Sequence, residues 1–74
     1  MAKKLPKYNT DKIRKKVAEL RAREGITKSE LAEKAKVNYN TVVKLEAGEN
    51  KNPTIKTLIS IAKAFNIHVE ELIT

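Results

Sequence analysis

The side chains best suited to recognising another molecule lie between Asn38 and Gly48. Asn38 is a good N-cap for a helix, and Gly48 stops that helix. Val42 and Leu45 have the spacing of its inward face. The outward face then presents Tyr39, Asn40, Val43 and Lys44. Because a helix fits the major groove of DNA, where each base pair shows a distinct pattern of donors and acceptors, this face is a candidate for reading base edges.

A second predicted helix must hold this one in place. The letters TKSE at residues 27–30 form a capping box, in which Thr27 is the N-cap and Glu30 reaches back to it. The inward positions of this helix are Leu31, Ala32 and Ala35. A three-residue turn over 35–37 joins the two helices, and Val37 fills the corner between them. Residues 27–48 therefore predict a helix-turn-helix.

Three further helices are predicted to complete the core. The first begins after Asn9 or Thr10, ends at Gly25, and has an apolar stripe of Ile13, Val17 and Leu20. The fourth in chain order follows the cap Thr54 and has a broad apolar face of Ile55, Leu58, Ile59, Ile61, Ala62 and Phe65. A helix stop at Asn66 and a short last helix over residues 68–73, with Val69 and Leu72 inward, follow. The predicted fold class is all-α, with five short helices around one core.

Length and charge limit the size of the domain and the kind of partner. The 74 residues suffice for one domain, and the formal net charge is +7. Seven of the 16 lysine and arginine residues fall within residues 1–16, where Asp11 is the single acidic residue. This excess indicates a polyanionic partner, although a solubilising surface explains it equally well. We expect residues 1–8 to form a flexible basic arm and residues 9–74 to form the domain.

Several function classes are not expected. The chain has no cysteine, so it has no disulfide, thiol chemistry or cysteine-based zinc site. It shows no nucleophile–base constellation, no metal-ligand cluster around its lone His68, and no phosphate-binding glycine loop, so we expect no enzyme and no cofactor. The apolar stretches are too short to span a membrane, and no signal peptide is recognisable. A cytoplasmic protein without a small-molecule effector pocket is the expectation.

Residues 10–73 resemble the helix-turn-helix domain of the phage repressor and Cro family, also called xenobiotic-response-element regulators. The matching stretches are ITKSELAEKAKV, TVVKLEAG, NP, LISIAKAFNI and VEEL. Each is weak alone, and together they are highly specific. The resemblance implies a lambda-repressor-like fold and a sequence-specific, double-stranded DNA-binding transcriptional regulator. It further implies a repressor that binds a two-fold operator as a homodimer.

The resemblance also implies roles for individual residues. Base contacts fall on Tyr39, Asn40 and Lys44, with Val43 at their edge, either touching a thymine methyl group or packing on the motif. Asn40 would pair with adenine, and Lys44 would donate to guanine. Phosphate contacts fall on Thr27, Lys28, Asn38, Asn50, Lys51 and Asn52. Arg21 and Glu46 match a partly buried ion pair beneath the motif.

Two positions depart from the family pattern. Lys36 stands where glycine is usual and the backbone takes a positive φ, which implies a strain of about 1 kcal/mol or a slightly different turn. His68 stands where serine or threonine often caps the last helix, so we expect a weaker cap there.

Two questions stay open at this stage. The basic arm resembles arms that wrap DNA in some family members, and a tail that aids solubility is an equal alternative. A different function, that of an antitoxin or another protein-binding adaptor, is possible on the same fold, although no separate toxin-binding segment is visible. If the chain forms a dimer, the candidate surface is Ile67, Val69 and Ile73 near the C-terminus.

Overall fold

The computed structural model describes residues 10–50 and 53–73, which form helices joined by short links. The helices are α1 (Thr10–Glu24), α2 (Lys28–Ala35), α3 (Tyr39–Ala47), α4 (Ile55–Ala64) and α5 (Glu70–Ile73). No strand occurs in this part of the chain. The predicted all-α class with five short helices is confirmed. The predicted arm over residues 1–8 lies outside the described residues.

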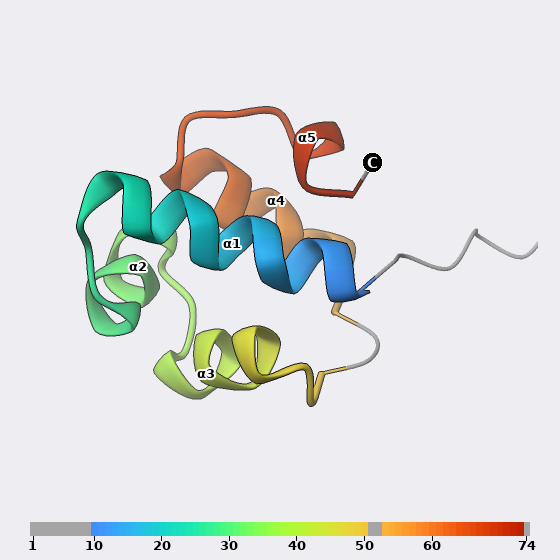
Figure 1. Ribbon diagram of the computed structural model, residues 1–74, viewed down its shortest axis with the longest axis horizontal. Helices are drawn as coiled ribbons and strands as arrows, with labels where there is room; N and C mark the ends of the chain where they lie inside the picture. The colour runs from blue at the N-terminus through green and yellow to red at the C-terminus, as the bar shows by residue number, and fades with distance from the viewer. Residues whose placement is uncertain (1–9, 51–52, 74) are drawn as a thin grey trace, which may run out of the picture.

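The helices are arranged around α1, which crosses the molecule in front of α4 in Figure 1. The α2–α3 pair lies on one side of α1 and the short α5 on the other. Helix α2 packs against α3 and α4, while α1 packs against α3 and α5. The two helices of the motif are therefore supported from behind by both long core helices.

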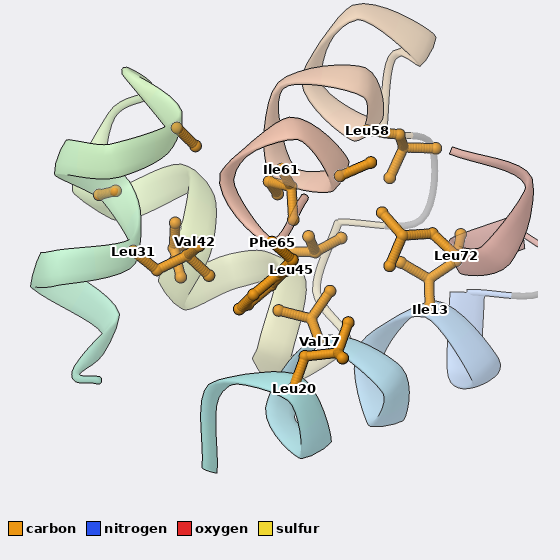
Figure 2. Close-up of a cluster of buried hydrophobic side chains, with 13 residues drawn as sticks. Ile13, Val17, Leu20, Leu31, Val42, Leu45, Leu58, Ile61, Phe65 and Leu72 are labelled. Carbon is orange, nitrogen blue, oxygen red and sulfur yellow. The ribbon is translucent and has the colours of Figure 1, made fainter. Parts of the chain in front are cut away.

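One cluster of buried side chains receives contributions from all five helices. Figure 2 shows Phe65 and Leu45 near its middle, and Leu72 toward Ile13 at one end. The predicted inward positions of α1, α2 and α3 are all buried. The members of the cluster are Ile13, Val17, Leu20, Leu31, Ala32, Ala35, Val42, Leu45, Leu58, Ile61, Ala62, Phe65 and Leu72.

Two apolar residues of α4 were wrongly predicted to be inward. Ile55 is 45% exposed and Ile59 is 40% exposed. Helix α4 instead buries a narrower stripe made of Leu58, Ile61 and Ala62, which continues into its C-cap, Phe65. The helix is apolar over a wider arc than its neighbours cover, so the residues at the edge of that arc remain in solvent.

The candidate dimer residues near the C-terminus are partly covered by the domain itself. Ile67, Val69 and Ile73 are only partly exposed and pack against the core cluster. They hold the α4–α5 link and α5 on the domain. The part of each side chain that stays exposed is smaller than that of a free surface residue, and their role in a dimer stays a prediction.

The last helix is shorter than the predicted span of residues 68–73, because α5 begins at Glu70. The His68 amide donates to Glu71 Oε2 at 3.4 Å, which is the weak half of a capping box. A serine or threonine in place of His68 would supply the other half of the box, because its hydroxyl oxygen could accept from the Glu71 amide. The late start of α5 agrees with the weaker cap expected of histidine.

Lys36 adopts the left-handed backbone conformation expected from the sequence, with φ 58° and ψ 43°. Its amide donates to Glu33 O at 3.2 Å, and the Val37 amide donates to Ala32 O at 3.0 Å. These bonds close the end of α2 and begin the tight turn to α3. The lysine therefore ends α2 in a conformation that favours glycine.

Replacing this lysine with glycine should stabilise the protein. Lys36→Gly is expected to raise the free energy of unfolding by about 0.5–1 kcal/mol, because relief of left-handed strain exceeds the added entropy of the unfolded chain. Urea unfolding followed by circular dichroism measures the change. Lys36→Ala is the control, since it removes the charge and keeps the strained Cβ. Equal stability of the two variants would contradict a strained turn.

Candidate nucleic-acid interface

Helix α3 is fixed at both ends by the residues expected to cap it. The side-chain oxygen Oδ1 of Asn38 accepts a hydrogen bond from the Asn40 amide at 3.0 Å. At the other end, Gly48 has φ 79°, and its amide donates to Leu45 O at 3.2 Å. A short helix is marginal in isolation, so these caps and the buried face keep α3 formed.

The two faces of α3 differ sharply in exposure. Val42 and Leu45 are buried in the core, whereas Tyr39 is 52% exposed. Asn40 and Lys44 are exposed, and Val43 is half-buried at the edge of their face. The structure therefore brings the four predicted base-contacting residues to one outward face of a single helix.

The start of α2 is the second part of the candidate interface. Thr27 Oγ1 accepts from the Glu30 amide at 3.0 Å, and Glu30 Oε1 accepts from the Thr27 amide at 2.8 Å. This predicted capping box is confirmed. Beside it, Lys28 is half-buried, and helix geometry leaves the first amides of α2 without an intrahelical acceptor. Those amides and the Lys28 ammonium group are the donors available to an anion.

The caps limit what two of the predicted phosphate-contacting residues can donate. Thr27 uses its own amide and one lone pair of its hydroxyl within the capping box, so the hydroxyl hydrogen is its remaining donor. Asn38 uses its side-chain oxygen as a cap, which leaves the Nδ2 group as its donor. Both residues position their helices first, and any contact with DNA uses what remains.

An ion pair joins α1 to α3 beneath the motif. Arg21 Nε donates to Glu46 Oε2 at 2.7 Å, and Arg21 Nη2 donates to Glu46 Oε1 at 2.9 Å. The third donor, Nη1, is 3.0 Å from the carbonyl oxygen of Ile26 in the α1–α2 link. The two side chains are 22% and 6% exposed, so the pair is largely shielded from water. Hydrogen bonding to Glu46 raises the pKa of Arg21 above its ordinary value, although burial opposes the rise.

The segment after α3 is the third part of the candidate interface. Asn50 is half-buried, and its amide donates to Lys44 O at 3.3 Å. Of the predicted phosphate contacts in this segment, Lys51 and Asn52 lie outside the described residues. Asn50 is thus held against the backbone of Lys44, which lies on the exposed face of α3.

Arg14 lies against the end of α3, although sequence reasoning counted it only among the basic residues of the N-terminal segment. A Cβ atom added to Gly48 would meet Arg14 Cδ at 3.3 Å. Arg14 Nη2 also forms an exposed ion pair with Asp11 Oδ1 at 3.2 Å. No local pattern could have paired Arg14 with Gly48, because the contact depends on how α1 crosses α3.

The described residues contain little else that could form a site. No group of three or more histidine or acidic side chains in them could hold a metal ion. None of the helices in residues 10–50 and 53–73 has the length and apolarity needed to cross a membrane. An open groove of about 480 Å³ lies between α1 and α5, lined by Lys12, Lys15, Lys16, Glu19, Glu71 and Leu72. Its lining residues belong to neither α2 nor α3.

The sequence of this chain is similar to those of known helix-turn-helix proteins. Residues 17–72 match a family described as Helix-turn-helix, of the Cro/C1 type. A protein of Archaeoglobus fulgidus, described as an uncharacterized HTH-type transcriptional regulator, is 40% identical over 60 residues, which is 81% of this chain and 84% of the relative. A second protein of that organism, with the same description, is 37% identical over 60 residues, covering 81% of this chain and 83% of the relative. The family match includes the whole of α2 and α3.

Proposed function

This chain belongs to the helix-turn-helix family of DNA-binding transcription regulators, and we propose that it is a sequence-specific repressor that binds a two-fold operator as a homodimer. The observation that carries the proposal is the exposed face of α3 opposite its buried Val42 and Leu45. The fold is lambda-repressor-like, and in that fold the second helix of the motif enters the major groove. The proposal requires no cofactor, catalytic step or small-molecule effector, and it places the protein in the cytoplasm.

The proposed contacts divide into two kinds. Asn40 and Lys44 supply an amide and an ammonium group suited to adenine and guanine edges, and exposed Tyr39 and half-buried Val43 lie beside them. Lys28 and the first amides of α2 offer donors that suit a backbone phosphate. Phosphate contacts fix the register of the protein on DNA, while base contacts determine the preferred sequence.

Dimer formation has a physical motive. One recognition helix of nine residues reads only a few base pairs, so a single copy discriminates poorly among DNA sequences. Two copies on half-sites about one helical turn apart would combine their affinities on one duplex. A DNA-bound dimer of this small size would repress by occupying the operator.

Selection from randomised duplexes tests sequence specificity, and a salt titration tests DNA binding itself. We expect enrichment of a short sequence repeated in inverted orientation, with half-site centres about 10 base pairs apart. Affinity for a mixed-sequence duplex should fall roughly 100-fold between about 50 and 200 mM salt, corresponding to about four neutralised phosphates. Absent or salt-insensitive binding would overturn the proposal and favour the antitoxin or adaptor function.

Two alanine substitutions separate base reading from phosphate binding. Asn40→Ala is expected to relax discrimination at one base pair by about 1–3 kcal/mol, whereas Lys28→Ala should weaken all duplexes by a similar factor and lower the salt slope. Binding to the enriched duplex and to single-base variants of it, measured by fluorescence anisotropy, gives both quantities. Ser29→Ala, at an exposed position next to Lys28, is the matched control. The assignment is wrong if Asn40→Ala and Lys28→Ala act alike on every duplex.

A further inference from the structure

Arg14, on α1, is a basic side chain that lies against the end of α3 and that the proposed DNA contacts do not use. A Cβ atom built on Gly48 would lie 3.3 Å from Arg14 Cδ and 3.4 Å from Nε, so the side chain passes directly over this glycine. Figure 1 shows the start of α1 and the end of α3 at the same end of the molecule. The Gly48 and Asn50 amides both donate to the carbonyl oxygen of Lys44. Arg14 therefore lies next to one predicted base contact and one predicted phosphate contact.

We propose that Arg14 binds a backbone phosphate of DNA beside the end of α3, and that Asp11 competes with DNA for it. In the free protein Arg14 Nη2 is 3.2 Å from Asp11 Oδ1. On DNA, a phosphate takes the place of this carboxylate. The inference rests on the proposed function for the duplex alone. It does not depend on a two-fold operator, on repression or on a homodimer.

The face of α1 that carries Arg14 is the face that supports α3. Arg14, Ala18 and Arg21 are spaced four and three residues apart, so they follow one another along one side of the helix. Arg21 Nε donates to Glu46 Oε2 at 2.7 Å, and Arg14 lies over Gly48, two residues further along the chain. The stem of Arg14 is thus packed before DNA arrives, which lowers the entropy cost of using its guanidinium group.

An open hollow of about 630 Å³ lies beside Arg14, between α1 and α3. Its lining residues are Arg14, Lys15, Ala18, Glu19 and Glu46. The Glu46 carboxylate is already neutralised by Arg21, which leaves two cations in the hollow against the carboxylate of Glu19. The Arg14 side chain is 34% exposed, so a ligand can reach its guanidinium group from solvent. The shape and the charge of the hollow both suit an anion.

The end of α3 is unfavourable for a phosphate unless a cation lies beside it. The last carbonyl groups of a helix carry a partial negative charge. Glu49, which directly follows Gly48, adds a formal negative charge and is exposed. A phosphate at the predicted contact Asn50 is therefore repelled by both groups. Arg14 offsets this repulsion, because a guanidinium group can donate two parallel hydrogen bonds to a phosphate.

The pair of Asp11 and Arg14 is weak enough to be exchanged. The Asp11 side chain is 76% exposed, and the two residues are three apart on the surface of α1. Exposed ion pairs of this kind contribute little to stability, because water screens them. A phosphate oxygen is an equally good acceptor, and the surrounding duplex adds further negative charge. Asp11 therefore lowers the affinity for DNA without holding Arg14 permanently.

Salt titration of variants that lack one charge tests the Arg14 contact. Arg14→Gln is expected to bind a mixed-sequence duplex about tenfold more weakly at roughly 100 mM salt, and to lower the slope of log affinity against log salt by about one. Arg23→Gln is the matched control. It removes the same charge from an exposed position nine residues, or about 2.5 turns, further along α1 and so on its opposite side. We expect this control to change the affinity by less than about twofold.

Asp11→Asn tests the competition. This variant is expected to bind the same duplex about threefold more tightly than the parent chain, because Arg14 is then free of the carboxylate. Loss of a negative charge near DNA would also strengthen binding, so the substitution is repeated in the Arg14→Gln background. There the gain should shrink to less than about 1.5-fold, since the two residues are coupled.

The outcomes separate a phosphate contact from a structural role. If Arg14 only supported the end of α3, Arg14→Gln would lower the free energy of unfolding and leave the salt slope unchanged, which would overturn the contact. Arg14→Lys keeps the charge and should restore the slope, even if Arg14→Gln is poorly folded. A loss in Arg23→Gln equal to that in Arg14→Gln would also overturn the contact.

Two further results concern the competition and the proposed function. If Asp11→Asn bound no more tightly than the parent chain, or gained equally in both backgrounds, the competition would be wrong. Each of these results leaves the proposed function standing, because the parent chain still binds the duplex. If the parent chain does not bind the duplex at all, the proposed function fails, and this inference fails with it.

Discussion

Glu46→Ala is expected to lower the free energy of unfolding by about 3 kcal/mol, which is the lower end of the effect of stranding a buried charge. The carboxylate accepts two hydrogen bonds from Arg21, at 2.7 and 2.9 Å, and is 6% exposed. Its removal leaves a largely shielded guanidinium with only the Ile26 carbonyl as a protein partner. Urea unfolding at equilibrium measures the loss.

Two controls define what this result means. Asp11→Ala breaks the exposed ion pair with Arg14 and is expected to change stability by less than about 0.5 kcal/mol. Arg21→Met combined with Glu46→Leu removes both charges and should recover most of the loss, because no charge is left without a partner. A double variant as unstable as Glu46→Ala would show that the stranded charge is not the cause.

The pH dependence of this pair follows from the direction of the Arg21 shift. Its pKa is raised in the folded chain, so the stability that it contributes is fully present below the ordinary guanidinium pKa. That stability is lost only as pH rises through the higher folded value. Arg21 therefore adds no pH dependence to stability between about pH 6 and pH 9.

Leu45→Ala should destabilise the chain by about 3–4 kcal/mol, within the range for truncating a buried leucine. Leu45 is 1% exposed and joins α3 to the core cluster. The neighbouring Lys44→Ala is the matched control, because it lies on the same helix and faces solvent. We expect Lys44→Ala to change stability by less than about 0.5 kcal/mol while it lowers affinity for the selected duplex.

Measuring both quantities on both variants tests the division of α3 into two faces. Unfolding gives stability, and anisotropy with the selected duplex, at a temperature where both variants are folded, gives affinity. If Lys44→Ala destabilised the chain as much as Leu45→Ala, α3 would not have the separate faces that DNA reading requires.

The parts of the fold that depend on local chemistry could be predicted from the sequence. The capping box of Thr27 and Glu30, the cap at Asn38 and the left-handed Lys36 each involve residues within a few positions of one another. The buried stripe of α1 follows from helical spacing alone. In each case the interacting groups are neighbours in the chain, so the local sequence pattern is enough to predict the cap or the buried face.

The parts that depend on coverage by distant elements could not be predicted in this way. Ile55 and Ile59 have the spacing of a core face, but their exposure is decided by where the neighbouring helices end. Ile67 shows the reverse, since it lies in the link after α4 and still packs against the core cluster. Exposure of Tyr39, Asn40 and Lys44 follows from periodicity, whereas their contact with bases stays a prediction until DNA is bound.

The three hydrogen bonds of Arg21 have a consequence for the entropy of recognition. One guanidinium joins α1, the entry to α2 and the end of α3, so the orientation of the recognition helix is set when the chain folds. The conformational freedom of that helix is then already lost before DNA arrives. Binding need not order it again, which leaves more of the contact energy for affinity and discrimination.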